Sequence, residues 1–131
     1  MIVVDTNIIS YLFLTGEFSE RAEKILLKDE KWAAPLLWRS EFRNVLAQYI
    51  RKKILTLDDA KEIMESASLL MEANEYHVDS AQVLDLANSS NLSAYDCEFI
   101  TLAKNLGCKM VTADQKIAAQ FSGYAVLIEA F

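Results

Sequence analysis

Residues 2–7, IVVDTN, decide the fold, because they combine a short apolar run with a carboxylate at its end. Ile2 to Val4 has the pattern of a buried strand, and Asp5 follows it directly. Residues 110–114, MVTAD, repeat this pattern near the other end of the chain and place Asp114 after a second strand. In open sheets of parallel strands, sites form beyond the carboxyl ends of the strands. Asp5 and Asp114 are therefore predicted to lie at such an edge.

Two further carboxylates, Glu41 and Asp96, interrupt segments that otherwise have the pattern of helices. Two carboxylates at strand ends, facing two on helices, can form one acidic pocket. Neighbouring carboxylates resist joint ionisation, so such a pocket is unfavourable without a cation. The natural occupant is a hard divalent cation such as Mg²⁺ or Mn²⁺, bound through oxygen.

The aspartates also have an ordinary structural explanation. Asp5 and Asp114 could each cap the helix that follows, and Asp96 stands three residues after Ser93 in a variant of the capping box. Each aspartate taken alone is open to either explanation, whereas the set of four with Glu41 favours a site.

The composition is that of a globular protein, and residues 1–131 are expected to form one domain. Of the 131 residues, 53% are hydrophobic and 24% are charged. No apolar run approaches the roughly 18 residues of a membrane span, and no signal peptide is evident. A cytoplasmic protein without a membrane partner is therefore expected. The net charge of −6 argues against a general nucleic-acid coat protein, but it does not exclude an enzyme with a local basic rim.

The cysteines and the histidine carry no recognisable motif. Cys97 and Cys108 form no CxxC pair, and the single His77 adds no zinc-ligand pattern. We expect both cysteines to be reduced, packed side chains and His77 to be structural, because no nucleophile motif accompanies it.

Strands and helices alternate along the predicted chain, which implies an α/β fold with a central parallel sheet flanked by helices. Strands are expected at 2–4, 32–34, 75–78, 109–112 and 124–128, and Pro35 is expected to stop the second. Helices are expected at 6–14, 19–26, 36–52, 56–71, 80–87, 93–107 and 115–121, with Thr56 and Ser93 as caps and Gly107 closing the sixth.

Four blocks of sequence, in order, resemble the PIN-domain nucleases. The first is IVVDTN at 2–7, and the second is Pro35 followed by EFRNVL at 41–46. The third is SAYD at 93–96, followed by Ile100 and LAKNLG at 102–107, and the fourth is VTAD at 111–114. The likeness covers nearly the whole chain. One departure is Cys97, where the family often has alanine, and both side chains are small.

The resemblance implies a PIN-like three-layer sandwich and Mg²⁺- or Mn²⁺-dependent cleavage of RNA. Asp5, Glu41, Asp96 and Asp114 would be the catalytic and metal-binding residues, with Asn7 and Thr112 as supporting polar residues. Many family members of this size are VapC-like toxins, which a cognate antitoxin protein holds inactive, and a homodimer is implied as well. The chemistry would be metal-assisted hydrolysis of a phosphodiester bond.

Substrate and partner signals are weaker. Arg39 and Arg43 on the Glu41 helix could steer an RNA backbone, although Glu41 could also be a solvated residue beside them. Arg51, Lys52 and Lys53 are more typical of cations at a helix C-terminus. The apolar residues 11–14, YLFL, could be core, part of an antitoxin groove or a dimer face. Glu98 is interpreted as solvated.

Three functions compete at this stage. The first is a metal-dependent endoribonuclease, the toxin of a toxin–antitoxin system. The second is a catalytically inactive PIN-fold module that binds RNA or protein, against which the complete acidic set counts. The third is a phosphoryl-transfer domain with Asp5 as nucleophile, which usually has a second aspartate two residues on, where this chain has Asn7.

Overall fold

A five-stranded parallel sheet forms the centre of the computed structural model, which describes residues 1–131. The strand order is β3-β2-β1-β4-β5, and every neighbouring pair is parallel. The strands span Ile2–Val4 (β1), Trp32–Pro35 (β2), Glu75–Tyr76 (β3), Met110–Thr112 (β4) and Ala125–Leu127 (β5). The central position of β1 follows from its sequence, since a strand flanked on both edges and covered on both faces has to be apolar throughout. The predicted parallel sheet is confirmed.

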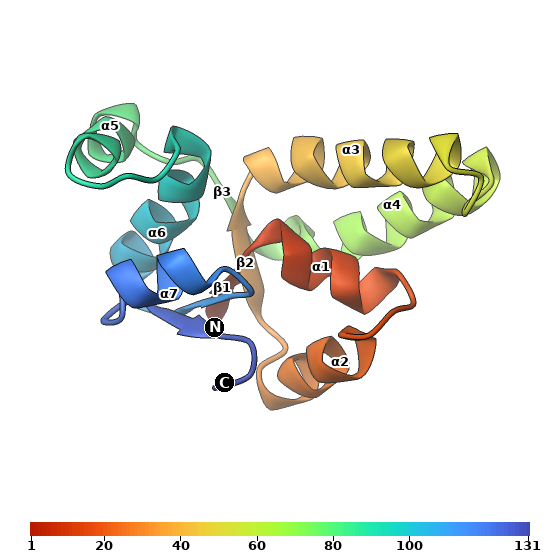
Figure 1. The fold of residues 1–131 in the computed structure, drawn as a ribbon, viewed down its shortest axis with the longest axis horizontal. Helices are drawn as coiled ribbons and strands as arrows, with labels where there is room; N and C mark the ends of the chain where they lie inside the picture. The colour runs from red at the N-terminus through yellow and green to blue at the C-terminus, as the bar shows by residue number, and fades with distance from the viewer.

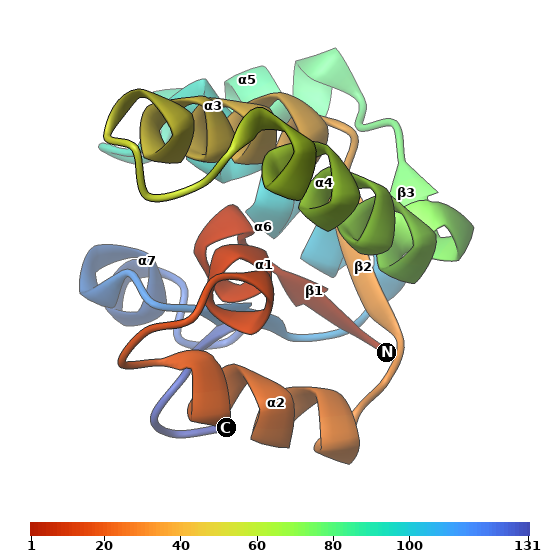
Figure 2. The same cartoon turned by 90° about the vertical axis from the view of Figure 1, so that its right-hand side faces the viewer.

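Helices connect the strands and cover both faces of the sheet (Figure 1). Their bounds are Thr6–Phe13 (α1), Ser19–Lys28 (α2), Leu37–Arg51 (α3), Leu57–Met71 (α4), Ser80–Asn88 (α5), Ala94–Leu106 (α6) and Gln115–Gln120 (α7), with a short 3₁₀ helix at Glu72–Asn74 (η1). Helices α1 to α4 lie on one side of the sheet and α5 to α7 on the other, which gives three layers. Figure 2 shows α3 and α4 side by side above α1, with α2 below α1. None of these helices is both long enough and apolar enough to cross a membrane.

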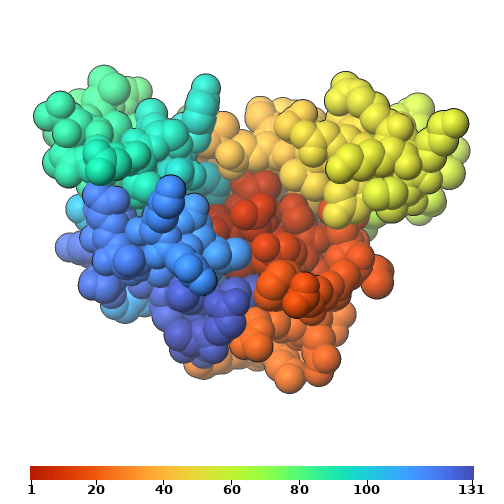
Figure 3. Space-filling view, in the orientation of Figure 1, coloured from red at the N-terminus to blue at the C-terminus, as the bar shows by residue number.

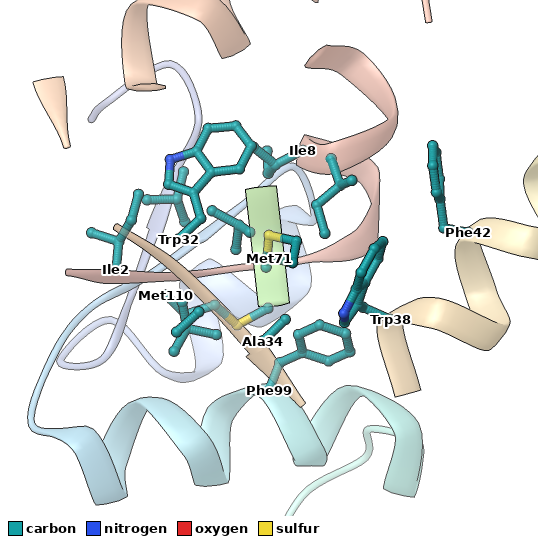
Figure 4. Packing of buried hydrophobic residues seen from close by; sticks show 14 of the residues in the cluster. Ile2, Ile8, Trp32, Ala34, Trp38, Phe42, Met71, Phe99 and Met110 are labelled. Atoms are coloured by element: carbon teal, nitrogen blue, oxygen red, sulfur yellow. The ribbon is translucent and has the colours of Figure 1, made fainter. Parts of the chain in front are cut away.

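The core joins both helical layers to the sheet. It contains 25 buried hydrophobic residues, and Figure 4 shows Trp32 of β2, Met71 of α4 and Met110 of β4 packed among them. The helix predicted at 56–71 supplies Ala60, Ala67 and Met71 to this core. Burying these apolar side chains is the main stabilising term of the fold.

The helix ends agree with the capping signals in the sequence. Thr56 accepts a hydrogen bond from Asp59 N at 3.1 Å, and Ser93 accepts one from Asp96 N at 3.1 Å. Gly107 ends α6 with φ of 64°, a left-handed conformation that glycine adopts without a steric cost.

One strand boundary differs from the prediction. Pro35 was expected to stop β2, but it is the last residue of that strand and pairs with Tyr76 of β3. Proline is tolerated there because the next residue, Leu36, donates its N–H to the Tyr76 carbonyl at 3.1 Å. Strand β3 itself is shorter than expected, since it ends at Tyr76 rather than at residue 78.

Candidate active site

Asp5 lies at the carboxyl end of the central strand, and three residues around it donate hydrogen bonds to its carboxylate. Its Oδ1 accepts a hydrogen bond from Ile8 N at 3.1 Å, so Asp5 caps α1 as the sequence allowed. Its Oδ2 accepts from the Thr112 hydroxyl and from Ala113 N at 3.2 Å. Both groups come from the end of β4, the strand next to β1, so the two predicted strand ends do meet.

The Asp5 carboxylate is unusually hard to ionise. Only 8% of the residue is exposed, and this burial raises the pKa of its carboxyl to about 6, although the hydrogen bond from Thr112 lowers it. A carboxylate that is buried and only partly compensated gains from a nearby cation, which favours its charged form.

Glu41 reaches the site from the second turn of α3. Its Oε1 accepts a hydrogen bond from the Thr6 hydroxyl at 2.7 Å. Glu41 is half-buried, and burial raises the pKa of its carboxyl, as does the negative charge of Asp96. It forms no ion pair with Arg39 or Arg43, so the explanation of Glu41 as a solvated partner of these arginines is wrong.

Asp96 and Asp114 complete the acidic set from the first turn of α6 and the start of α7. The pKa of Asp96 is raised by burial and by the negative charge of Asp114. Asp114 is exposed, and its Oδ1 accepts hydrogen bonds from Lys116 N at 2.8 Å and Ile117 N at 3.2 Å, so it caps α7. Capping leaves Oδ2 of Asp114 without a protein donor, so the cap and the pocket are compatible.

One small pocket of about 100 Å³ collects these four carboxylates. Its apolar wall is formed by Phe99, Met110 and Ile117, and its polar residues are Asp5, Thr6, Asn7, Glu41, Asp96 and Asp114. In Figure 3 the helices that supply them border a hollow between the arm of α5 and α6 and the arm of α3 and α4. The start of the chain, coloured red, lies at the floor of this hollow.

The donor set fits one kind of metal ion better than others. No three of the carboxylates converge into a closed cage of ligands. Mg²⁺ does not need one, since it usually keeps several waters and binds proteins through one or two carboxylates. An all-oxygen set without histidine or cysteine also disfavours Zn²⁺. The residues present therefore fit a hydrated Mg²⁺ or Mn²⁺ ion.

Of the two predicted supporting residues, Asn7 lines the pocket, and Thr112 contacts the acidic residues through hydrogen bonds. The Thr112 hydroxyl donates to Asp5 and accepts from Asp114 N at 3.0 Å, so it links two of the four acidic residues. Asn7 is exposed on the pocket wall. Thr6, which orients Glu41, was not predicted. Its position in the first turn of α1, directly after Asp5, is the signal that could have identified it.

The two arginines proposed to contact RNA have different surroundings. The Arg39 guanidinium binds both oxygens of Glu75, and the Trp38 indole N–H donates to the same carboxylate at 2.7 Å. Arg39 therefore ties α3 to β3 and lacks a free guanidinium. Arg43 is exposed, and its only hydrogen bond is to the Ser40 hydroxyl at 3.2 Å.

Three other sequence expectations meet the structure as follows. Cys97 is buried, Cys108 is half-buried, and both are free thiols, as expected. In the 11–14 patch, Leu14 is buried and the other three residues are half-buried against the core, which favours the core explanation. Glu98, interpreted as solvated, is instead half-buried in the wall of a second pocket.

Comparison with known proteins shows where this arrangement recurs. The chain is 28% identical over 123 residues to "Ribonuclease VapC3" of Pyrobaculum aerophilum, and the match covers 92% of this chain and 94% of that protein. A "Toxin-antitoxin complex from Klebsiella pneumoniae" contains a chain with a TM-score of 0.75 at 17% identity, with full coverage of both chains. The structure of PAE2754 from Pyrobaculum aerophilum has a TM-score of 0.77 at 22% identity, with 98% of this chain and 90% of that chain covered. The family model described as "PIN domain" matches residues 2–121. The chain therefore belongs to the PIN domain family.

Proposed function

We propose that this chain is a metal-dependent endoribonuclease, which hydrolyses RNA phosphodiester bonds and is the toxin of a toxin–antitoxin system. The observation that carries the proposal is the gathering of Asp5, Glu41, Asp96 and Asp114 in one pocket from four separate elements. A structural role for these residues needs only the caps, and capping does not require four carboxylates to face one cavity. Membership of the PIN family and the relative named a ribonuclease support the same function.

The proposed cofactor is Mg²⁺ or Mn²⁺, bound in the pocket of the four carboxylates, by one or two of them directly and by the others through bound water. When bound, the ion supplies an activated water and neutralises charge that builds up on the phosphate oxygens. The chain's own residues prepare the site for it. Thr112 fixes the orientation of Asp5, and Thr6 fixes that of Glu41, so both carboxylates are held in place before the ion arrives.

The surroundings of the pocket fit an extended substrate. The hollow in Figure 3 lies between the helical arms that contribute Glu41 and Asp96, and a strand of RNA laid across it would not have to thread through a closed opening. Arg43 lies half a turn beyond Glu41 on α3 with an exposed guanidinium and is the proposed contact to an RNA phosphate. Arg39 is a weaker candidate, since it would have to leave Glu75.

Cleavage of total cellular RNA tests the proposal. The purified protein is incubated with RNA in Mg²⁺, in Mn²⁺ and in EDTA, beside an Asp96→Asn variant. The control is Asp58→Asn, which removes an exposed carboxylate from the first turn of α4. We expect discrete fragments that need both metal and Asp96, with Asp58→Asn as active as the unmodified chain. If neither metal yields fragments and expression does not arrest growth, the proposal fails and an inactive binding module takes its place.

The proposed partner is an antitoxin protein, and the proposed location is the cytoplasm. A relative of this fold occurs in a structure named as a toxin–antitoxin complex, which supports such a partner. Expression of the chain together with the gene next to its own should abolish growth arrest and yield a complex that purifies as one species. Growth arrest that persists with every neighbouring gene would contradict the antitoxin.

A further inference from the structure

A second pocket lies beside the acidic one, and the hydrolysis chemistry does not use it. Its volume is about 400 Å³, within the range of small-molecule sites. It lies between the end of β3, the start of α3 and helices α5 and α6. Figure 1 shows β3 at this position between the two helical arms.

The two pockets adjoin through a pair of carboxylates. Glu98 lines the second pocket and lies close enough to Glu41, in the acidic pocket, for the two charges to repel. Glu98 also follows Asp96 by two residues on α6, so one helix contributes to both pockets. A nucleotide bound along α6 would therefore contact residues of both pockets.

The walls of the second pocket suit a flat aromatic ring. Tyr76 and His77 offer aromatic faces, and Leu36, Val78 and Val83 offer apolar surface. Unpaired RNA bases bind proteins by stacking on tyrosine and histidine rings and by hydrogen bonds along their Watson–Crick edges. Leu84 also lines the pocket and is 63% exposed, so its side chain is accessible to a ligand.

Glu98 narrows the choice of base. Neither of its carboxylate oxygens has a hydrogen-bond partner within the chain, so it can accept two donors from a ligand. Guanine presents two adjacent donors, N1–H and the N2 amino group. Adenine and cytosine each place an acceptor nitrogen beside their amino group, and uracil flanks its single N–H with two carbonyls. Only guanine matches both carboxylate oxygens without a repulsive contact.

We propose that this pocket is a subsite for an unpaired guanine base next to the scissile phosphate of the RNA. The subsite gives the nuclease its base preference, and Glu98 is the residue that selects the base. The inference rests on the proposed ribonuclease function, but base binding can be measured without cleavage.

The first test is photo-crosslinking in EDTA, where no cleavage occurs. The probe is an RNA hexamer with one 6-thioguanosine and five uridines. We expect cross-links within residues 75–84, and a several-fold lower yield in Leu84→Ser. Leu69→Ser on α4 is the matched control, since Leu69 is 64% exposed and does not line the pocket, and it should not change the yield. Cross-links that map elsewhere would overturn the subsite.

The second test is competition by unlabelled hexamers that contain guanosine, inosine or uridine at the same position. Inosine lacks the N2 amino group and should compete roughly tenfold less well than guanosine, because it loses one hydrogen bond to a charged group. In Glu98→Gln this difference should shrink, since an amide has only one acceptor oxygen. Glu62→Gln, which changes an exposed residue on α4, should leave the difference between guanosine and inosine unchanged. An unchanged difference in Glu98→Gln would overturn the role of Glu98.

Cleavage separates the subsite from the proposed function. Sequencing of fragment ends should show a guanine preference at one position next to the cut, and Glu98→Gln should weaken this preference. Guanosine-selective cross-linking without any cleavage would keep the subsite and reject the nuclease. Cleavage without base preference or cross-links would keep the nuclease and reject the subsite. If Glu98→Gln lost Mn²⁺ binding, Glu98 would be a metal ligand and the subsite assignment would be wrong.

Discussion

At the scale of single residues, the acidic site consists of side chains with two tasks. Asp5 caps α1 with one carboxylate oxygen and accepts a hydrogen bond from the Thr112 hydroxyl with the other. Asp114 caps α7 and also lines the acidic pocket. The backbone N–H groups at helix starts partly offset the negative charges, which allows the carboxylates to lie close together without metal. Burial still leaves Asp5 with a raised pKa of about 6.

Asp5→Asn should therefore stabilise the metal-free protein at neutral pH. The folded state holds the Asp5 proton more tightly than the unfolded chain does, so stability falls as the pH rises from 3.8 to about 6. At pH 7.5 the cost of the buried charge is on the order of 2–3 kcal/mol. Asparagine removes this cost, but its amide group cannot accept the hydrogen bond that Ala113 N donates to Oδ2, so the net gain is smaller. Urea unfolding in EDTA should show this gain at pH 7.5, and most of it should vanish at pH 4.

The same variant should respond differently to metal. Mn²⁺ should raise the Tm of the unmodified chain and have little effect on Asp5→Asn, because the variant lacks one of the proposed ligands. An Asp5→Asn protein that is no more stable than the parent in EDTA at pH 7.5 would show that the Asp5 charge is well solvated or compensated.

The positions of individual site residues could be predicted where the sequence pattern involves only neighbouring residues. An acidic residue directly after an apolar run gave Asp5 and Asp114, and the structure places both in one pocket. Thr6 was not predicted because its role depends on Glu41, which is 35 residues away in sequence. The Arg39–Glu75 ion pair was not predicted for the same reason, since sequence spacing does not show which distant charged residues are in contact.

At the scale of elements, α6 shows how short signals set a boundary. Ser93 opens the helix and Gly107 closes it, and both ends were predicted from residue type alone. The other long helices could be predicted from the helical spacing of their apolar residues, because this spacing also depends only on residues close in sequence. The extent of β3 was harder to predict, since this two-residue edge strand is defined by its pairing with β2.

Gly107→Ala tests the closing signal of α6. A methyl group at this position would meet no atom within 4 Å, so the expected cost is that of the left-handed backbone alone, about 1 kcal/mol. Gly16→Ala is the control, because Gly16 has the same free space and no positive φ. Thermal unfolding should show a lower Tm for Gly107→Ala only. Equal effects of the two variants would contradict the cap.

The ion pair between α3 and β3 predicts a specific dependence on pH. The hydrogen bond from Arg39 is the main reason why the pKa of Glu75 lies below 4.5, so the charged form stabilises the fold above that pH. Glu75→Gln should lower the Tm at pH 7, and the difference from the parent should shrink as the pH falls below 4.5. Glu65→Gln, an exposed change on α4, should have no such effect. If Glu75→Gln lowered the Tm by the same amount at every pH, its effect would come from altered packing rather than from the lost charge.

At the scale of the whole molecule, we propose that residues 1–131 act as one domain, because one core cluster joins the sheet to both helical layers. The net charge of −6 repels the RNA backbone. RNA binding therefore relies on local positive charge, such as that of Arg43 and a bound cation. A bound cation should consequently strengthen RNA binding beyond the binding that contacts to the base alone give in EDTA.

The predicted homodimer is testable by mass. Several large apolar side chains are exposed, among them Leu27, Leu57 and Leu69 at 87%, 56% and 64%. The family resemblance implies a dimer, whose interface would cover part of this exposed apolar surface. Light scattering on the purified chain should therefore give twice 14.8 kDa. A mass of 14.8 kDa at micromolar concentration would rule the dimer out under those conditions.

The position of β1 has a consequence for how the protein is made. This first strand pairs with β4, and Asp5 receives its hydrogen bond from Thr112, 107 residues later. A nascent chain still attached to the ribosome cannot form these contacts until β4 has left the exit tunnel. A partly synthesised copy therefore holds Asp5 and Glu41 but lacks the other half of the acidic pocket. The order of the strands delays assembly of the site until β4 and the start of α7 have been synthesised.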